Sequence, residues 1–118
     1  MDDGKLFKEI ISLMPFNSKM FIYTSDRSFA SKLEKIVFEV ADGVIVIDLF
    51  DTNKKRLINL IDKRIQDPIE QVSIKVGEKM IFEGYDGLEF GLISKYYPLS
   101  STINTLIASE LCAVSKDW

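Results

Sequence analysis

The chain has 118 residues, of which 47% are hydrophobic and 28% are charged, and its formal net charge is −3. This length and balance predict one folded domain over residues 1–118 and exclude a disordered chain. No apolar run approaches the ~20 residues that cross a bilayer, and the acidic N-terminus lacks the apolar core of a signal peptide. We therefore expect a cytoplasmic protein that does not enter a membrane.

Two residue types that serve much of enzyme and metal chemistry are scarce. The sequence contains no histidine and one cysteine, Cys112. Nucleophilic triads that use histidine and structural zinc sites are thereby excluded, and one cysteine forms no internal disulfide. We expect a protein without enzymatic activity, cofactor or metal. An enzyme would have to work through carboxylates, lysine, tyrosine or a hard metal ion.

The first half of the chain predicts alternating helices and strands. Helices are expected over residues 3–14, about 25–40 and about 52–66, and strands over 19–24 and 44–50. The second strand is apolar on consecutive positions, which is typical of a strand covered on both faces. A strand–helix–strand crossover brings strands together in parallel, so we expect these two strands to run in the same direction.

After Pro68 the period of the hydrophobic residues changes from about 3.6 to 2. Residues 72–92 alternate, with glycine-containing turns at 77–79 and 84–87, and predict an antiparallel meander. A last helix is expected from Ser100, its N-cap, to about residue 115. The order α-β-α-β-α-β-β-β-α predicts an α/β (mixed α+β) domain, in which helices cover a mixed parallel and antiparallel sheet.

The segment from Val72 to Glu110 resembles the end of a thioredoxin-like domain, with a strand, a glycine turn, a strand and a C-terminal helix. No CxxC motif is present, so the resemblance implies no redox activity. It implies a non-catalytic module that acts as a subunit or adaptor. A free edge of the meander would then allow self-pairing into a homodimer.

Three aspartates at the ends of predicted strands raise the alternative of a magnesium site. Asp26, Asp48 and Asp51 could supply oxygen ligands where ligands often bind in α/β sheets. However, Asp48 and Asp51 would point to opposite faces of a continuing strand. Asp51 or Thr52 is also well placed to cap the helix that follows, and Asp26 or Ser25 the helix before it. We favour capping and expect no metal site.

Two residues near the end of the last predicted helix stand out. Glu110 falls inside the apolar face of that helix, where a carboxylate would need a partner or a frayed helix end. Cys112 falls on the polar side of the same helix. Because it has no basic neighbour to favour the thiolate, we expect it to be inert.

Charge is unevenly distributed along the chain. Residues 1–65 hold 11 basic and 10 acidic side chains, whereas residues 66–118 hold 4 basic and 8 acidic ones. The third predicted helix is basic, with Lys54, Lys55, Arg56, Lys63 and Arg64. No aromatic residue accompanies this cluster for stacking on bases, so we interpret it as a solvated face rather than a nucleic-acid site.

The acidic residues of the second half concentrate in the meander, and the alternation there predicts two faces. Met80, Phe82, Leu88 and Phe90 are expected to face inward, and Ile81, Glu83, Glu89 and Ile93 to share the opposite face. Tyrosines flank the acidic residues, and aromatic anchors with carboxylates are typical of a binding surface. The predicted partner-binding residues are Glu83, Tyr85, Asp86, Glu89, Tyr96 and Tyr97.

A small, acidic, histidine-free domain of this kind resembles the bacterial immunity proteins that block nuclease toxins, including those of contact-dependent growth inhibition systems. The resemblance lies in size, charge and lack of motif, so no site residues carry over from it. It implies a basic nuclease toxin as partner, with carboxylates filling the cleft that binds phosphates. It implies no direct contact with nucleic acid.

Overall fold

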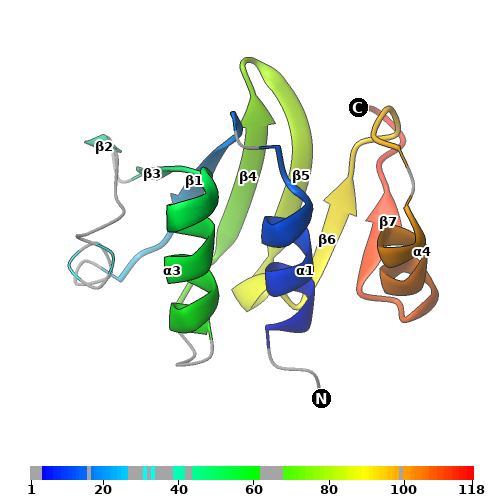
Figure 1. Cartoon of the computed structure of the whole chain (residues 1–118), viewed down its shortest axis with the longest axis horizontal. Coiled ribbons are helices and arrows are strands. Elements are labelled where there is room, and N and C mark those ends of the chain that lie inside the picture. Colours follow the sequence, from blue (N-terminus) through cyan, green and yellow to red (C-terminus); the bar gives the residue numbers. More distant parts are fainter. Residues whose placement is uncertain are drawn as a thin grey trace.

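Seven described strands form one sheet, and three described helices pack against it (Figure 1). The computed structural model describes residues 4–15, 17–26, 31, 33, 39–41, 44–61, 68–98 and 100–118. The strands are β1 (Lys19–Tyr23), β2 (Glu39–Ala41), β3 (Val44–Asp48), β4 (Gln71–Val76), β5 (Lys79–Tyr85), β6 (Phe90–Ile93) and β7 (Cys112–Val114). The helices are α1 (Lys5–Leu13), α3 (Asp51–Ile61) and α4 (Ser101–Ala108), with a short 3-10 helix η1 (Asp86–Leu88) before β6.

The strand order is β2-β3-β1-β4-β5-β6-β7. Neighbouring strands are antiparallel except for β6 and β7, which are parallel, so the predicted mixed α/β sheet is confirmed. The predicted parallel pairing of β1 with β3 is wrong, because these strands are antiparallel. The prediction lacked β2, which lies within residues assigned to a helix. β2 runs in the direction of β1, and β3 returns between them after a two-residue connection.

The helices bury the apolar stripes that their sequences predict. In α1, Leu6, Phe7, Ile10 and Ile11 are buried, and the helix ends just before Pro15, which cannot continue it. α3 buries Leu57, and α4 buries Ile103 and Leu106. Most of the predicted helix over residues 25–40 and the end of the one over 52–66 lie outside the described residues.

All three helices lie on the same face of the sheet (Figure 1), and one hydrophobic core fills the space between them and the strands. The strand residues in this core alternate along each strand, as a sheet covered on that side requires. They include Met20, Ile22, Ile45, Ile47, Val72, Ile74, Phe82, Ile93 and Cys112. Ile45, Val46 and Ile47 are all buried, which agrees with the expectation that β3 is covered on both faces, although α1, α3 and α4 all pack on one side.

The meander β4–β5–β6 is confirmed, but part of its predicted facing is wrong. Phe82 pairs with Ile93, and both are fully buried, whereas Phe90 pairs with Tyr85 and is 39% exposed. The facing of Phe90 follows from the β5–β6 register, in which it lies opposite Tyr85. A β-bulge lies earlier in β5, where Ile74 pairs with Phe82 but Lys75 pairs with Met80. Ile81 is therefore an additional residue in β5, and it packs against the core.

The last predicted helix is shorter than expected, and a strand comes after it. The Ser100 side chain accepts a hydrogen bond from the Ile103 N–H, which confirms the N-cap. α4 ends at Ala108 because Glu110 adopts a left-handed backbone, with φ of 63°. The Glu110 N–H donates to the Ile107 carbonyl and the Leu111 N–H to the Leu106 carbonyl, as in a Schellman motif. Glu110 is thus an exposed turn residue, and its predicted place in an apolar helix face is wrong.

Candidate functional site

The sheet face opposite α1, α3 and α4 carries the second set of alternating strand residues. We call it the open face, since no described helix lies on it. Its residues are Lys19, Phe21 and Tyr23 of β1, Val44, Val46 and Asp48 of β3, Gln71, Ser73 and Lys75 of β4, Glu83 and Tyr85 of β5, and Phe90 and Leu92 of β6. None of them belongs to the hydrophobic core cluster.

Aromatic side chains form a row across one end of the open face. The cross-strand register places Tyr23 next to Gln71, Gln71 next to Tyr85, and Tyr85 next to Phe90. Tyr23 is 36% exposed and Phe90 is 39% exposed, so both rings offer area to another molecule. Aromatic rings held on strands give large contact area at low cost in conformational entropy.

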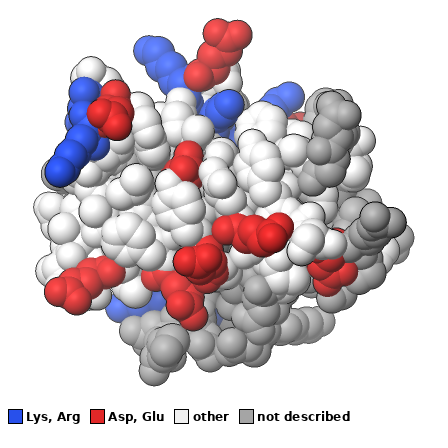
Figure 2. Space-filling view, turned by 180° about the vertical axis from the view of Figure 1, so that it is seen from behind, with Lys and Arg blue, Asp and Glu red and all other residues white. Residues whose placement is uncertain are grey.

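Acidic residues gather at the same end of the open face. Figure 2 shows them across the lower half of the molecule, while Lys and Arg lie mostly along the upper edge. The backbones of Glu70 and Asp86 are adjacent, because the Asp86 N–H donates to the Glu70 carbonyl over 3.1 Å. Glu83 lies within β5 and Glu89 just before β6, and Glu70, Asp86 and Glu89 are exposed. We call these four residues the acidic cluster.

The other end of the open face is richer in lysine. Lys19 lies beside Lys75 in the register and 3.9 Å from the Asp48 carboxylate. The Lys75 ammonium lies 5.4 Å from the centre of the Phe21 ring, which is a cation–π geometry. The open face is therefore polarised, with acidic groups around the aromatic row and basic groups toward the β4–β5 turn.

Tyr85 is the residue that ties the aromatic row to the acidic cluster. Its hydroxyl donates a hydrogen bond to the Glu83 carboxylate. Burial, then this hydrogen bond and the negative charge of Glu83, raise the pKa of Tyr85 to about 12. Tyr85 is consequently neutral at physiological pH, and the hydrogen bond fixes the orientation of one carboxylate on the face.

The structure divides the six predicted partner-binding residues into two groups. Glu83, Tyr85, Asp86 and Glu89 come together around the aromatic row. Tyr96 and Tyr97 lie beyond β6, near the β4–β5 turn at the other end of the sheet. Tyr96 is 80% exposed.

Tyr97 has a structural role within the described part of the chain. Its hydroxyl donates to the Leu13 carbonyl over 3.0 Å, which links the segment after β6 to the end of α1. Burial raises the pKa of this tyrosine. Both the hydrogen bond and the burial hold Tyr97 in place as part of the fold rather than leaving it free for a partner.

Sequence reasoning missed three residues of this surface. Tyr23 and Glu70 were not singled out, and Phe90 was assigned to the buried side. Tyr23 could have been found from the alternation of residues 19–23. In a strand this alternation places Lys19, Phe21 and Tyr23 together on one face, opposite Met20 and Ile22. The facing of Phe90 depends on the connection through η1, which brings Phe90 opposite Tyr85 and has no period of its own in the sequence.

The three aspartates considered as metal ligands do not converge. Among the described residues, no group of three or more His, Cys, Asp or Glu side chains could hold a metal ion. Asp48 faces Lys19 on the open face, and Asp51 is the first residue of α3, where its charge favours the helix N-terminus. The Asp26 N–H donates to the Thr24 hydroxyl, in the turn after β1.

Two other positions from the sequence are also placed by the structure. Cys112 lies in β7 and is 3% exposed, so its predicted place on a polar helix side is wrong, and burial raises the pKa of its thiol. The Lys54 ammonium donates to the Met14 carbonyl, which joins α3 to the end of α1. Lys55 and Arg56 are exposed, and Lys63 and Arg64 lie outside the described residues.

No helix in the described ranges combines the length and apolar character needed to cross a bilayer. No protein-family model, curated protein or solved structure matches the chain. A function therefore has to be inferred from the chemistry of the chain's own residues, and the open face is the surface where that chemistry is concentrated.

Proposed function

We propose that the protein is a non-enzymatic binding protein whose open face docks a basic protein, and that this partner is a nuclease toxin which it blocks. The observation that carries the proposal is the position of the acidic cluster around the aromatic row at one end of the open face. Aromatic rings would supply contact area, and carboxylates would supply attraction and orientation.

The mechanism rests on the chemistry of a nuclease cleft. Such a cleft binds phosphates with Lys and Arg, and carboxylates can take the place of those phosphates. Glu83 is held in a fixed orientation by the Tyr85 hydroxyl, which reduces the cost of ordering it on binding. Substrate would then be excluded because its backbone and the acidic cluster compete for the same cationic groups.

The alternative of a thioredoxin-like assembly module receives less support. Its expected feature was a free meander edge for self-pairing, but β6 is paired with β7. The predicted series of strand, turn, strand and helix is present, but β7 comes after α4 and completes a sheet in which β1, β3 and β4 are antiparallel. We therefore place the open face, rather than a strand edge, at the centre of the proposal.

Charge reversal tests the proposal. The double variant Asp86→Lys/Glu89→Lys changes two exposed residues of the acidic cluster, and we expect it to slow association with a basic nuclease domain by about tenfold or more. The matched control, Glu78→Lys/Asp117→Lys, makes the same change in net charge at exposed residues that lie outside the cluster. We expect the control to change the association rate by less than about twofold.

The measurement is surface binding kinetics at low and high salt, together with inhibition of nuclease activity. The product of the adjacent reading frame is the first partner to test. Association of the wild-type protein should slow as salt screens the charges. Equal losses in both double variants would mean that net charge alone matters, and unchanged inhibition in the Asp86/Glu89 variant would move the interface away from this end of the open face.

A further inference from the structure

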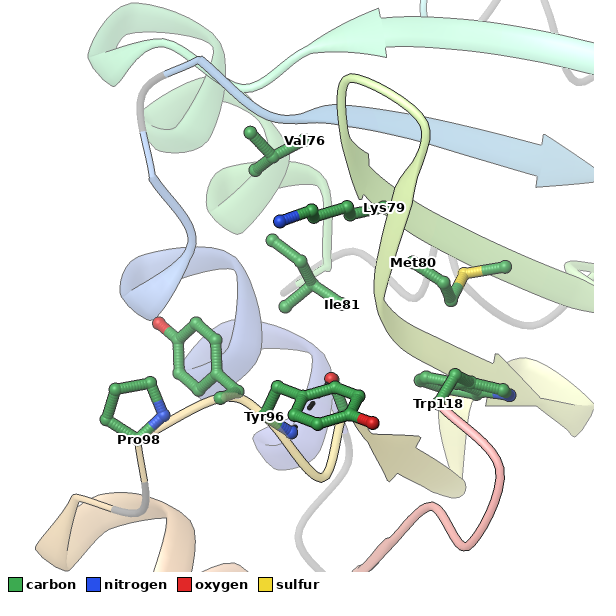
Figure 3. Close-up of a pocket in the computed structure, with 9 residues that line it drawn as sticks. Val76, Lys79, Met80, Ile81, Tyr96, Pro98 and Trp118 are labelled. Atoms are coloured by element: carbon green, nitrogen blue, oxygen red, sulfur yellow. Dashed lines mark hydrogen bonds between the residues drawn. The ribbon is translucent and has the colours of Figure 1, made fainter.

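A pocket of about 560 Å³ lies at the end of the sheet away from the acidic cluster (Figure 3). Its walls come from the end of β4, the start of β5, the segment after β6 and the C-terminal segment. Val76, Met80, Ile81, Tyr97 and Trp118 give it an apolar and aromatic lining. This volume and lining are those of a site for a small organic molecule.

The bulged residue of β5, Ile81, lines the pocket. A bulge bends and twists its strand at such a position. The Ile81 carbonyl accepts a hydrogen bond from the Ser94 N–H over 2.7 Å, so the bulged residue also anchors the segment after β6. Ile81 is consequently both the bulged residue and part of the pocket wall.

Hydrogen bonds made outside the pocket hold the segments that carry its aromatic residues. The backbone N–H of Trp118 donates to the Ser115 hydroxyl over 3.1 Å, and the backbone carbonyl of Trp118 accepts from the Lys95 N–H over 2.8 Å. The Tyr97 hydroxyl donates to the Leu13 carbonyl. These contacts preform the pocket, which lowers the cost of ordering it when a ligand binds.

Lys79 gives the pocket its charge. Among the described residues that line the pocket, Lys79 alone has an ionic side chain, and Figure 3 shows it extended toward Val76 and Ile81. No hydrogen bond or ion pair to another described residue holds its ammonium group. Lys95 lies nearby, with its ammonium 5.2 Å from the centre of the Tyr96 ring.

The acidic groups near this end do not form part of the pocket wall. Glu78 precedes Lys79 in the β4–β5 turn, and Asp117 precedes Trp118, and both are exposed. Neither lines the pocket. The site therefore combines an apolar body with one cationic group at its mouth, which disfavours a cationic ligand and leaves a neutral ligand without a partner for the lysine.

We propose that this pocket binds a small amphiphilic carboxylate. The apolar body of the ligand would pack against Val76, Ile81 and Trp118, and its carboxylate would pair with the Lys79 ammonium. A single cation in an apolar lining fits one carboxylate better than a polyanion such as a nucleotide. The pocket lies away from the acidic cluster, so this inference does not rest on the proposed function.

Trp118 makes the proposal directly testable, because it is the one tryptophan of the chain and lines the pocket. Dodecanoate and dodecan-1-ol have the same apolar chain, and only the former carries a carboxylate. Titration of the purified full chain with each, below the concentration at which either self-associates, should change Trp118 fluorescence saturably. We expect dodecanoate to bind about tenfold more tightly than the alcohol, as a hydrogen bond to a charged group predicts.

Two matched variants separate the role of Lys79 from a general effect of charge. Lys79→Met should remove the preference for dodecanoate and leave binding of the alcohol unchanged. Lys75→Met is the control, because Lys75 also lies at this end of the sheet but does not line the pocket. Lys79→Arg should keep most of the preference, since it keeps the charge.

Three results would overturn the proposal. One is the absence of any saturable change in Trp118 fluorescence with dodecanoate up to the concentration at which it self-associates. Another is equal affinity of the wild-type protein for dodecanoate and dodecan-1-ol. The third is an equal loss of dodecanoate binding in Lys79→Met and Lys75→Met. All variants would first be shown to keep the wild-type circular dichroism and melting temperature.

Discussion

The two faces of the sheet are built from the same strands, yet they carry different apolar side chains. The helix-covered face is mostly aliphatic, and its β1 and β4 residues are Met20, Ile22, Val72 and Ile74. The open face places the aromatic residues Phe21, Tyr23, Tyr85 and Phe90 among charged groups. Aliphatic side chains fill a dry core without polar atoms, whereas aromatic ones can remain partly wet and still offer a large contact area.

The difference indicates that the faces serve different purposes. The helix-covered face contributes stability, because its side chains are removed from water almost completely. The open face keeps Tyr23 and Phe90 partly exposed next to carboxylates, while Val46 and Ser73 on the same face are buried. Substitutions on the first face should therefore change the free energy of unfolding, and substitutions on the second should change binding.

The largest expected effect compares two phenylalanines on neighbouring strands. Phe82→Ala removes a ring that is 0% exposed in the core and should lower the free energy of unfolding by about 3–5 kcal/mol. Phe90→Ala removes a ring that is 39% exposed on the open face and should cost less than about 1 kcal/mol. Urea denaturation of both variants measures the difference. Equal losses would show that the open face belongs to a packed core.

A smaller effect tests how tightly the helix-covered face is packed. A Cβ atom added at Gly91 would lie 2.3 Å from the Phe82 ring Cζ and 3.0 Å from the Glu83 carbonyl oxygen. Gly91→Ala should therefore cost about 1–3 kcal/mol in the free energy of unfolding. Adding Phe82→Leu, which shortens the opposing side chain, should recover part of that loss in a double-mutant cycle. If the effects of Gly91→Ala and Phe82→Leu on the free energy of unfolding simply added, residue 91 and the Phe82 side chain would not be in close contact.

A substitution at a residue outside both faces should raise the free energy of unfolding rather than lower it. Glu110 has a left-handed backbone, with φ of 63°, at the end of α4. Glycine adopts this conformation without the steric cost of a Cβ atom, so Glu110→Gly should raise the free energy of unfolding by about 0.5–1 kcal/mol. Glu110→Ala, which keeps a Cβ atom, is the control and should not. Thermal unfolding would distinguish the two, and a gain in both would point to loss of charge instead.

The smallest effect concerns the pH dependence of the open face. Folding raises the pKa of Tyr85 from 10.0 to about 12, so the folded state favours the protonated phenol. The resulting stability is fully present below pH 10 and is lost as pH rises through about 12. Tyr85→Phe should remove this part of the decline while leaving the other tyrosines to titrate. An unchanged phenolate absorbance curve in Tyr85→Phe would contradict the assignment.

Local structure was largely predictable from the sequence, because it depends on periodicity and on capping residues. The amphipathic pattern of residues 5–13, the alternation in β4 and the Ser100 cap each predicted the element that the structure contains. Strand direction was not predictable in the same way. β1 and β3 look alike in either orientation, and their pairing depends on where the intervening chain re-enters the sheet.

Short elements account for the remaining differences. β2 and β7 have three residues each, too few to show a period of 2 within a longer apolar pattern. The bulge at Ile81 likewise adds one residue without a recognisable sequence signal, and it reverses the predicted facing of Ile81. The connection through η1 pairs Phe90 with Tyr85 and so reverses the predicted facing of Phe90. Most acidic residues of the candidate surface were predicted, because charged side chains stay near the surface whatever the strand register. The aromatic residues were predicted only in part, because the face they occupy changes when the register shifts by one residue.

The shortness of the two outer strands, β2 and β7, has a consequence for behaviour at high concentration. Each offers only three residues of backbone to an approaching chain. A short edge strand gives another chain few backbone groups with which to pair, even though the sheet has several strands between its two edges. Concentrated protein should therefore resist amyloid formation, and thioflavin fluorescence during prolonged incubation would reveal it if it does not.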